Sequence, residues 1–467
     1  MANDMILSRE ACQALADRVR RMARGPGTTR VAISSVWLGD VRWGRNRTMM
    51  AGDARDVIVR IMRRHRAAAG RAETSRLDDA GLEAAVRWAE EAMRAKSTVH
   101  LWDLPPGTRT FAKPTIWSGA TIGLTSAARG DLVRSLIQPA EAAGLFSAGY
   151  LAVGAFTEAF FDPDGQQGYC ARTTAQCSIS VRDPSGRGSG WAGGSAHDWA
   201  ALDPVALARR AQEKCRASRE PVAVEPGRYT VVLEPQAVGD LMDLVTNYLG
   251  RPPAERGDGP FADRQRPGFS KLGLKVADER VSFGHDPEDP ELGVCPFNAA
   301  GEPYRAVRWV ERGVLTALTY DRAYAVEEFN ENIPLPNSRA LRMQGGETTI
   351  EEMIRTTRRG LLVTRFSGLR VTDHNALLAS GVTRDGLWLI ENGKISKAVK
   401  NFGFSESPLF VLNSLEQLGP PVPVFRLDQA EEQFGQHDRP AFRAHVPMIV
   451  PPLKARDFNF NRLVDAV

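Results

Sequence analysis

The 467-residue chain is longer than one hydrophobic core usually spans, so we expect two domains. Hydrophobic residues at 43% and charged residues at 25% are typical of a globular protein and exclude a disordered or fibrous chain. The net charge of +4 is too small to indicate a nucleic-acid partner. Residues 1–76 hold sixteen arginines against seven acidic residues, but no aromatic residues interleave with the basic run at 60–66, so a solvated face is the simpler interpretation.

The five cysteines are an odd number and form no C-x-x-C pair. They indicate reduced thiols in a cytosolic protein and argue against a disulfide framework or a zinc knuckle. The sequence opens without a basic segment followed by an apolar one, and it has no run of about 18 apolar residues. We therefore expect no membrane span and a cytoplasmic location.

The first hundred residues are expected to place helices on an antiparallel sheet. Apolar residues recur at helical spacing over 8–24 and again over 78–96. Strand-like alternation lies between these helices, at 30–37, 41–50, 56–62 and 66–74, with a first turn expected at Leu38-Gly39-Asp40. Because the strands follow one another without intervening helices, the pattern predicts the α+β class, with an N-terminal α/β layer domain built on an antiparallel sheet.

The rest of the first half continues this layer. The expected elements are a loop over 98–125, a helix over 127–144 with a kink or break at Pro139, a hairpin of 150–161 and 169–181, and a helix over 204–217. The glycine-rich segment 189–195 is expected to be a flexible loop. It overlaps a formal G-x-G-x-x-G match, but a dinucleotide site needs a helix that opens at the glycines, and the next helix begins only after Asp203.

Glu225-Pro226-Gly227 is the best domain boundary, which divides the chain into domains 1–222 and 223–467. The second domain is expected to be mostly antiparallel β and barrel-like, with few helices. The expected strands are 229–233, 279–284, 305–310, 314–320, 361–365, 369–373, 386–391 and 395–397, the last two joined by the hairpin signal Asn392-Gly393. The expected helices are 236–249, 349–358 and 408–418, with a polar loop over 251–260 and an extended Pro-rich tail.

The helix expected over 236–249 follows directly after a buried strand and Pro235, which makes it a rigid place for a site. Val238, Leu241, Met242, Val245 and Leu249 form its apolar stripe. The polar residues Asp243, Asn247 and Tyr248 are then a site, the remains of one, or a solvated face.

Patterns for common chemistries are sparse elsewhere. The sequence contains neither G-x-S-x-G nor the phosphate loop G-x-x-x-x-G-K-[ST], and only His437 and His445 lie within ten residues of each other, in the Pro-rich tail. Asp373, His374 and Asn375 place an acid, an imidazole and an amide between a strand and a loop. They are candidates for peptide binding, or they form a turn with side-chain hydrogen bonds to the backbone. His285-Asp286-Pro287 allows the same two interpretations, and its Asp-Pro step favours the turn.

Six segments of the second half occur in a recognisable order. They are Pro226-Gly-Arg-Tyr-Thr-Val-Val-Leu-Glu-Pro, Gly293-Val-Cys-Pro-Phe-Asn-Ala-Ala-Gly-Glu-Pro, Trp309-Val-Glu-Arg-Gly-Val-Leu, Glu352-Met-Ile-Arg-Thr-Thr-Arg-Arg-Gly-Leu-Leu-Val-Thr, Gly381-Val-Thr-Arg-Asp-Gly-Leu-Trp-Leu-Ile-Glu-Asn-Gly-Lys-Ile and Val399-Lys-Asn-Phe. No single segment is specific, but their order over 226–420 resembles the TldD/PmbA family, whose two branches pair as TldD and TldE in a cytosolic peptidase complex.

The resemblance to the catalytic branch implies a zinc peptidase with H-E-x-x-x-H on the helix after this strand and a later cysteine as third ligand. By that correspondence Asp243 stands at the first histidine, Leu244 at the glutamate and Tyr248 at the second histidine. Leu244 cannot act as a general base, Tyr248 is a poor zinc ligand, and no cysteine follows Cys295. The resemblance therefore implies the non-catalytic TldE/PmbA-like branch, with neither a catalytic residue nor a metal ligand in this chain.

The function that these expectations favour is a non-catalytic subunit of a heteromeric zinc metallopeptidase that processes or degrades unfolded or extended peptides. A TldD-like partner subunit would supply the zinc, no nucleic acid or membrane would be involved, and a homodimer is also compatible with the sequence. Two alternatives stay open. One is an independent hydrolase that uses Asp373 and His374 with another nucleophile, and the other is a peptide-binding carrier protein.

Overall fold

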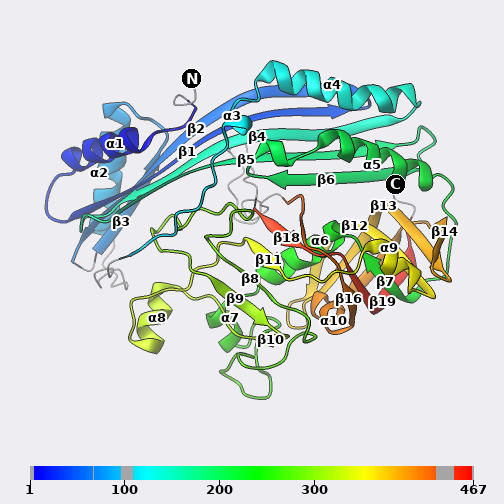
Figure 1. Ribbon diagram of the computed structural model, residues 1–467. Coiled ribbons are helices and arrows are strands. Elements are labelled where there is room, and N and C mark those ends of the chain that lie inside the picture. Colours follow the sequence, from blue (N-terminus) through cyan, green and yellow to red (C-terminus); the bar gives the residue numbers. More distant parts are fainter. Residues whose placement is uncertain (1–4, 67, 96–108, 427–445, 465–467) are drawn as a thin grey trace.

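The computed structural model describes residues 5–66, 68–95, 109–426 and 446–464. These residues form three sheets, of which one six-stranded antiparallel sheet comes from the first half and two come from the second half. In Figure 1 the first sheet and its helices form the upper layer, and most of the chain after residue 226 lies beneath it. The predicted α+β class is confirmed.

The first sheet has the strand order β3-β2-β1-β4-β5-β6, so every neighbour except the β1–β4 pair is also consecutive in sequence. Its strands are β1 (Thr28–Gly44), β2 (Arg47–His65), β3 (Ala68–Thr74), β4 (Phe146–Phe161), β5 (Gln167–Arg182) and β6 (Ser189–Ala196). Its helices are α1 (Arg9–Met22), α2 (Asp79–Ala95), α3 (Gly119–Ile122), α4 (Ser126–Ala142) and α5 (Pro204–Ala217).

Strand alternation decides which face of this sheet the helices cover. Val31 and Ile33 of β1 pack with residues of α1 and α2, whereas Val41 and Trp43 pack with residues of α4 and α5. The opposite face of β1 includes Ala32, which packs with Phe297 of the second half. Because successive strand residues point to opposite faces, one face carries the helices and the other receives the second half of the chain.

The expected turn at Leu38-Gly39-Asp40 is wrong, because β1 runs through these residues without a break. The turn lies at Arg45 and Asn46, which both have positive φ, as a two-residue hairpin turn requires. Gly39 has a packing role, since a Cβ atom there would lie 2.5 Å from the guanidinium carbon of Arg129 on α4. A glycine that makes room for a side chain therefore looks the same in sequence as a glycine in a turn.

The expected flexible loop at 189–195 is also wrong, because these residues form β6. A Cβ atom at Gly190 would lie 2.2 Å from the carbonyl oxygen of Ala211, so the glycine allows α5 to approach the strand closely. No helix opens at the glycines, and the structure therefore contradicts a dinucleotide-binding turn here.

The largest sheet of the second half contains a closed five-stranded barrel. The strand order is β12-β7-β19-β15-β13-β14, and an additional β12–β13 pairing closes the ring of β12, β7, β19, β15 and β13. Its strands are β7 (Gly227–Leu233), β12 (Arg359–Asp373), β13 (Leu378–Glu391), β14 (Lys394–Ala398), β15 (Phe402–Glu406), β16 (Leu415–Leu418) and β19 (Leu453–Leu463). The expectation of a barrel-like, mostly antiparallel second half is confirmed, with β7–β12 as a parallel pair.

A smaller sheet lies beside the barrel, in the order β10-β9-β8-β11-β18-β17. Its strands are β8 (Phe283–His285), β9 (Val307–Glu311), β10 (Val314–Leu315), β11 (Leu341–Met343), β17 (Val422–Pro423) and β18 (Met448–Val450). The helices of the second half are α6 (Pro235–Thr246), α7 (Arg251–Glu255), α8 (Arg322–Phe329), α9 (Ile350–Arg355) and α10 (Pro408–Asn413).

Several boundaries in this half differ from the expectations. The strand expected over 314–320 is only two residues long, β12 unites the two strands expected at 361–365 and 369–373, and the helix expected over 408–418 ends at Asn413 before β16. The short helix α7 replaces part of the loop expected over 251–260, because Ala254 is buried in the core. The Asn392-Gly393 turn joins β13 and β14 as predicted, with positive φ at both residues.

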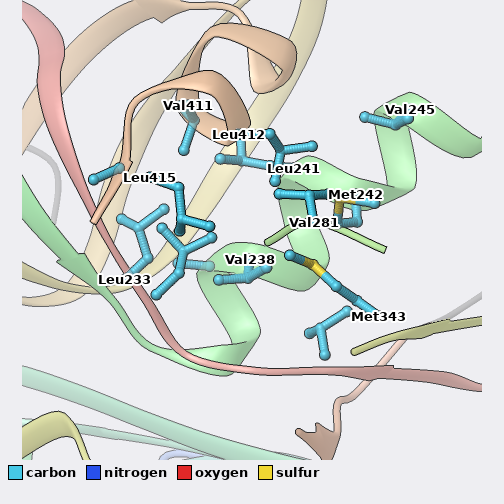
Figure 2. Close-up of a cluster of buried hydrophobic side chains, with 14 of the residues drawn as sticks. Leu233, Val238, Leu241, Met242, Val245, Val281, Met343, Val411, Leu412 and Leu415 are labelled. Carbon is cyan, nitrogen blue, oxygen red and sulfur yellow. The ribbon is translucent and has the colours of Figure 1, made fainter. Parts of the chain in front are cut away.

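Helix α6 packs its apolar stripe into the main core of the second half (Figure 2). Val238, Leu241, Met242 and Val245 are all buried, and they contact residues of the barrel, of α10 and of the smaller sheet. The helix ends at Thr246, earlier than the expected residue 249, so Tyr248 lies in the turn that follows it. The stripe fixes the rotation of α6 about its axis, and thereby the direction of its polar residues.

The two halves meet along β6. The Ser195 hydroxyl donates a hydrogen bond to the carbonyl oxygen of Val424 (2.8 Å), and Lys214 of α5 pairs with Glu234 (2.5 Å). The strands of the first sheet all precede residue 222, but the exact division at 222/223 stays a prediction. In the described part of the chain no helix is long and apolar enough to cross a membrane.

Candidate functional site

A cleft of about 1110 Å³ runs along the polar face of α6. Gln236, Asp240, Asp243, Leu244 and Asn247 face it from this helix and its end, at the spacing of one helical face. The opposite wall is the stretch of β12 from residue 365 to residue 371, which has passed its last pairing with β7 at Val363. The remaining wall residues that the site uses come from distant parts of the chain: Trp191, Arg339, His374, Phe425 and Arg426.

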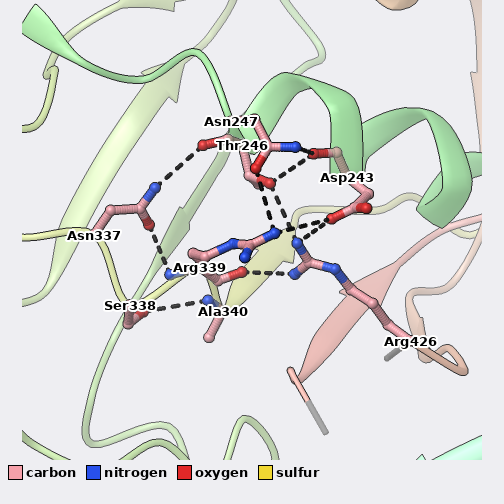
Figure 3. Close-up of polar contacts among 8 residues, drawn as sticks. All are labelled: Asp243, Thr246, Asn247, Asn337, Ser338, Arg339, Ala340 and Arg426. Carbon is pink, nitrogen blue, oxygen red and sulfur yellow. Dashed lines mark hydrogen bonds and ion pairs between the residues drawn. The ribbon is translucent and has the colours of Figure 1, made fainter. Parts of the chain in front are cut away.

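The Asp243 carboxylate is held by arginines (Figure 3). Arg426 forms an ion pair with it and also donates to the carbonyl oxygen of Arg339 (2.7 Å) and to the Thr246 hydroxyl (3.3 Å). The Arg339 guanidinium lies 3.9 Å from the same carboxylate and donates to the Asn247 side chain (3.3 Å). Because the Arg426 side chain is only 6% exposed, the centre of this cluster is a largely desolvated cation that donates to three oxygen acceptors.

The other two positions of the implied motif also face the cleft. Leu244 packs against the main core and offers no donor or acceptor beyond its backbone. The Tyr248 hydroxyl is 2.5 Å from Nδ1 of His374, and partial burial raises the pKa of Tyr248 above its ordinary value. The structure therefore brings together Asp243, Leu244, Tyr248 and His374 around one cleft.

Asp240 lies one turn before Asp243 on the same helix face. Its carboxylate accepts hydrogen bonds from the backbone N–H of Phe366 (2.8 Å) and from the side-chain amide of Gln236 (2.9 Å). Desolvation raises the pKa of Asp240 to about 6, although these two hydrogen bonds act in the opposite direction. Asp240 thus ties α6 to β12, and it takes up a proton as the pH falls through about 6.

Zinc is the metal that the resemblance implies for the catalytic branch, and the residues at this site do not fit it. A zinc site needs several nitrogen, sulfur or carboxylate ligands on one ion. Here Asp243 already has a guanidinium partner, Leu244 has no ligating atom, and Tyr248 is paired with His374. Within residues 5–66, 68–95, 109–426 and 446–464, no three His, Cys, Asp or Glu residues are grouped so that they could hold a metal ion.

The remaining candidates from the sequence have separate places. Asp373 accepts hydrogen bonds from the backbone N–H groups of Asn375 (2.8 Å) and Ala376 (3.2 Å), which lower its pKa. Of the three candidate peptide-binding residues, Asp373 and Asn375 thus belong to a turn beside the cleft, and only His374 lines it. His437 and His445 lie outside the described residues.

His285 is a core residue. Its ring packs against Tyr304 and Trp309, with centroid distances of 5.9 and 5.5 Å, and burial lowers its pKa to about 4. A neutral imidazole between two aromatic rings packs as an apolar group. His285 itself is therefore a packing residue, and the turn expected from Asp286-Pro287 follows directly after it. The Asp289 N–H donates to the Asp286 carbonyl oxygen (3.1 Å), and the Glu288 N–H donates to the Asp286 side chain (2.9 Å).

Sequence reasoning missed the arginines of the cleft. Arg426 lies 183 residues after Asp243, and Arg339 comes from the loop before β11, so no local pattern connects them. Asp240 could have been found, because it precedes Asp243 by three residues and shares its helix face.

The family follows from comparison with known proteins. The sequence profile of the PmbA/TldA metallopeptidase C-terminal domain matches residues 226–462, which is half of the chain. The chain belongs to the PmbA/TldD family. This result confirms the resemblance carried by the six segments. The matched region contains α6, nearly all of the barrel, and every cleft-lining residue except Trp191.

Relatives of this PmbA/TldD family member are known from archaea. A metalloprotease of Methanothermobacter thermautotrophicus is 25% identical over 229 residues, which are 46% of this chain and 47% of that protein. A zinc metalloprotease TldD homologue of Saccharolobus solfataricus is 21% identical over 206 residues, 41% of this chain and 44% of that protein. The chain thus spans about half the length of the curated relatives that it matches.

Solved structures share the whole fold. A Bacteroides thetaiotaomicron protein described as a candidate modulator of DNA gyrase superposes with a TM-score of 0.80 at 17% identity, covering 98% of this chain and 100% of that one. TldE from Thermococcus kodakarensis superposes with a TM-score of 0.76 at 14% identity, covering 96% of this chain and 99% of that one. At such identities the likeness establishes the fold of this PmbA/TldD family member and nothing about its chemistry.

Proposed function

We propose that the chain is a non-catalytic, TldE/PmbA-like subunit of a cytoplasmic heteromeric metallopeptidase. A TldD-like partner with H-E-x-x-x-H would hold the zinc and cleave unfolded or extended peptides, and this chain would help to form the peptide-binding chamber. The chain itself would then contain no zinc and no catalytic residue.

One observation carries this proposal: Asp243, at the first position of the implied motif, is bound by an arginine. The Asp243 carboxylate pairs with Arg426, whose guanidinium supplies the positive charge that a metal ion would supply beside these residues. Leu244 leaves no carboxylate to activate water, and the cleft itself is retained. A helix and cleft that lack the metal ligands are what a structural subunit of such an enzyme would contain.

The test compares the purified chain with its complex. We expect less than stoichiometric zinc in the chain alone by elemental mass spectrometry, and no cleavage of an unstructured fluorogenic peptide. Cleavage should begin when a TldD-like partner with H-E-x-x-x-H is added. One zinc per chain together with chelator-sensitive proteolysis by the chain alone would refute the proposal.

The independent hydrolase receives less support from the geometry, because the Asp373 carboxylate is directed to its own turn and does not orient His374. His374→Ala in an active single-chain preparation would have to abolish turnover for that alternative to stand. The peptide-carrier alternative is tested by co-purification. That alternative predicts a stable homodimer with bound peptide and no metallopeptidase partner.

A further inference from the structure

The cleft along α6 carries an excess of positive charge. Four arginines line it, Arg339, Arg365, Arg370 and Arg426, together with only two acids, Asp240 and Asp243. Asp243 is already paired with Arg426, and the Asp240 carboxylate is directed to the Phe366 N–H and the Gln236 amide. Arg365 is paired with Asp385 behind the wall. Arg339 shares the Asp243 carboxylate with Arg426, at 3.9 Å, so Arg370 is the arginine of this cleft that has no ion pair with a described residue.

These two arginines differ in how they are held. Arg339 is partly buried, with its side chain 23% exposed, and it donates to Asn247 beside Asp243. Arg370 is exposed on β12, opposite Ser380 of β13, and it makes no ion pair with any residue that the structure describes. The cleft thus offers one guanidinium that is anchored beside Asp243, and another on β12 that has no ion pair with a described residue.

The surroundings of the arginines favour a carboxylate on an extended, partly apolar chain. Trp191, Phe366, Leu369 and Phe425 supply apolar walls, and the Tyr248–His374 pair supplies polar atoms. Guanidinium groups bind the planar carboxylate through paired N–H donors, and a volume of about 1110 Å³ has room for several peptide residues. The two aspartates beside the arginines disfavour a doubly charged phosphate, because they would repel it more strongly than a single carboxylate.

We infer that this cleft binds peptides through a carboxylate group, either the C-terminal carboxylate or an Asp or Glu side chain, with Arg370 and Arg339 as its specificity-determining residues. The inference rests on the proposed function, since it names the feature of the peptide that this subunit would recognise. The subunit would then orient a peptide in the complex by holding one negatively charged group at a fixed place.

The test measures binding of N-acetylated short Ser/Leu peptides, which carry no charged label, to the full chain alone by isothermal titration calorimetry. Four versions carry a free C-terminus, a C-terminal amide, an amide with one central Glu, and an amide with one central Gln. We expect the carboxylate peptides to bind about tenfold more tightly than the uncharged ones, which corresponds to about 1.4 kcal/mol. Preference for the free C-terminus or for the central Glu identifies the source of the carboxylate, and either preference supports the inference.

Variants make the test specific. Arg370→Gln should remove most of the preference, and Arg370→Lys should retain part of it because the charge remains. Arg87→Gln is the matched control, since Arg87 on α2 is also exposed and has no ion pair with a described residue. The Arg87→Gln variant should bind each of the four peptides as tightly as the wild type does.

Equal binding of all four peptides, or an unchanged preference in Arg370→Gln, would overturn the inference. So would competition in which inorganic phosphate displaces the peptide more effectively than acetate at equal concentration. These binding measurements use the chain without a partner. A negative result would therefore overturn the carboxylate inference and leave the proposed role in partner-dependent cleavage untouched. Conversely, carboxylate-dependent binding with no cleavage by the complex would contradict only the proposed function.

Discussion

At the scale of single residues, the Asp243–Arg426 pair is the feature that distinguishes this cleft from a metal site. The Arg426 side chain is 6% exposed, so it depends on Asp243, Thr246 and the Arg339 carbonyl for its hydrogen bonds. Removing one partner of a largely buried pair leaves an uncompensated charge, which is costlier than losing the pair as a whole.

We therefore predict that Asp243→Asn lowers the free energy of unfolding by about 2–3 kcal/mol, less than for a fully buried pair because Asp243 is 27% exposed. Urea denaturation of Asp243→Asn, Arg426→Gln and the double variant measures this. The double variant should be more stable than the sum of the two single losses implies, by roughly 1 kcal/mol or more. Additive losses would show that the two side chains do not interact.

Asp240 gives a second prediction, which concerns pH. Its folded-state pKa of about 6 lies above the ordinary value of 3.8, so between pH 4 and 6 the folded chain binds more protons than the unfolded chain. The contribution of Asp240 to the free energy of unfolding is therefore most favourable below pH 4, and it declines as the pH rises to 6.

Asp240→Asn cannot ionise, and its side-chain oxygen can still accept from Phe366. Relative to the wild type, this variant should gain about 1–3 kcal/mol of stability between pH 4.5 and pH 7, since each pKa unit is worth about 1.4 kcal/mol. Urea unfolding of both proteins at the two pH values is the measurement. A difference between the two proteins that does not change with pH would mean that Asp240 ionises normally.

At the scale of elements, the sequence predicted the helices and strands whose signals are local. The side chains of Asp203 and Ser8 accept hydrogen bonds from the first turns of α5 and α1, which are signals of this local kind. The failures involve glycines whose reason is a distant partner, namely Gly39 against Arg129 and Gly190 against Ala211. The cleft could be predicted only on its helical side, because Arg339 and Arg426 reach Asp243 through tertiary folding.

The close contact of β6 with α5 yields a third prediction. In Gly190→Ala the new methyl group would meet the Ala211 carbonyl oxygen at 2.2 Å and the Cys215 nitrogen at 2.5 Å. Strand and helix must separate, which should cost about 2–3 kcal/mol of unfolding free energy by overpacking. Calorimetry measures this loss of stability as a decrease in the thermal midpoint of Gly190→Ala.

Gly130→Ala in α4 is the matched control, because a Cβ atom there meets nothing within 4 Å. This change should raise stability by about 0.5–1 kcal/mol through helix propensity. Equal effects of the two substitutions would contradict the packing role of Gly190.

At the scale of the whole molecule, the cleft depends on both halves of the chain, since Trp191 of β6 forms part of its wall. The link runs through Asp385, whose side chain is 1% exposed and pairs with Arg365, while it also accepts a hydrogen bond from the Ser189 hydroxyl (2.8 Å). Arg365 in turn lies over the Trp191 ring, 4.9 Å from its centroid.

We expect Asp385→Asn to weaken the coupling between the halves. Asn keeps the shape and tolerates the positive φ at this position, but it removes the charge opposite Arg365. Calorimetry should show a loss of about 2–4 kcal/mol and a broader or split unfolding transition. A sharp single transition at the wild-type midpoint would show that Asp385 does not link the halves.

The most direct measurement of the central claim asks which subunit performs cleavage in a reconstituted complex with a TldD-like partner. Substituting the glutamate of the partner's H-E-x-x-x-H by Gln should abolish peptide cleavage completely. The second arm uses a double variant of this chain, Asp243→Asn with His374→Ala, assembled with the wild-type partner. The kcat of that complex should equal the kcat of the wild-type complex. Loss of kcat in the assembled double variant, together with residual cleavage by the complex of the Gln-substituted partner, would contradict the non-catalytic role.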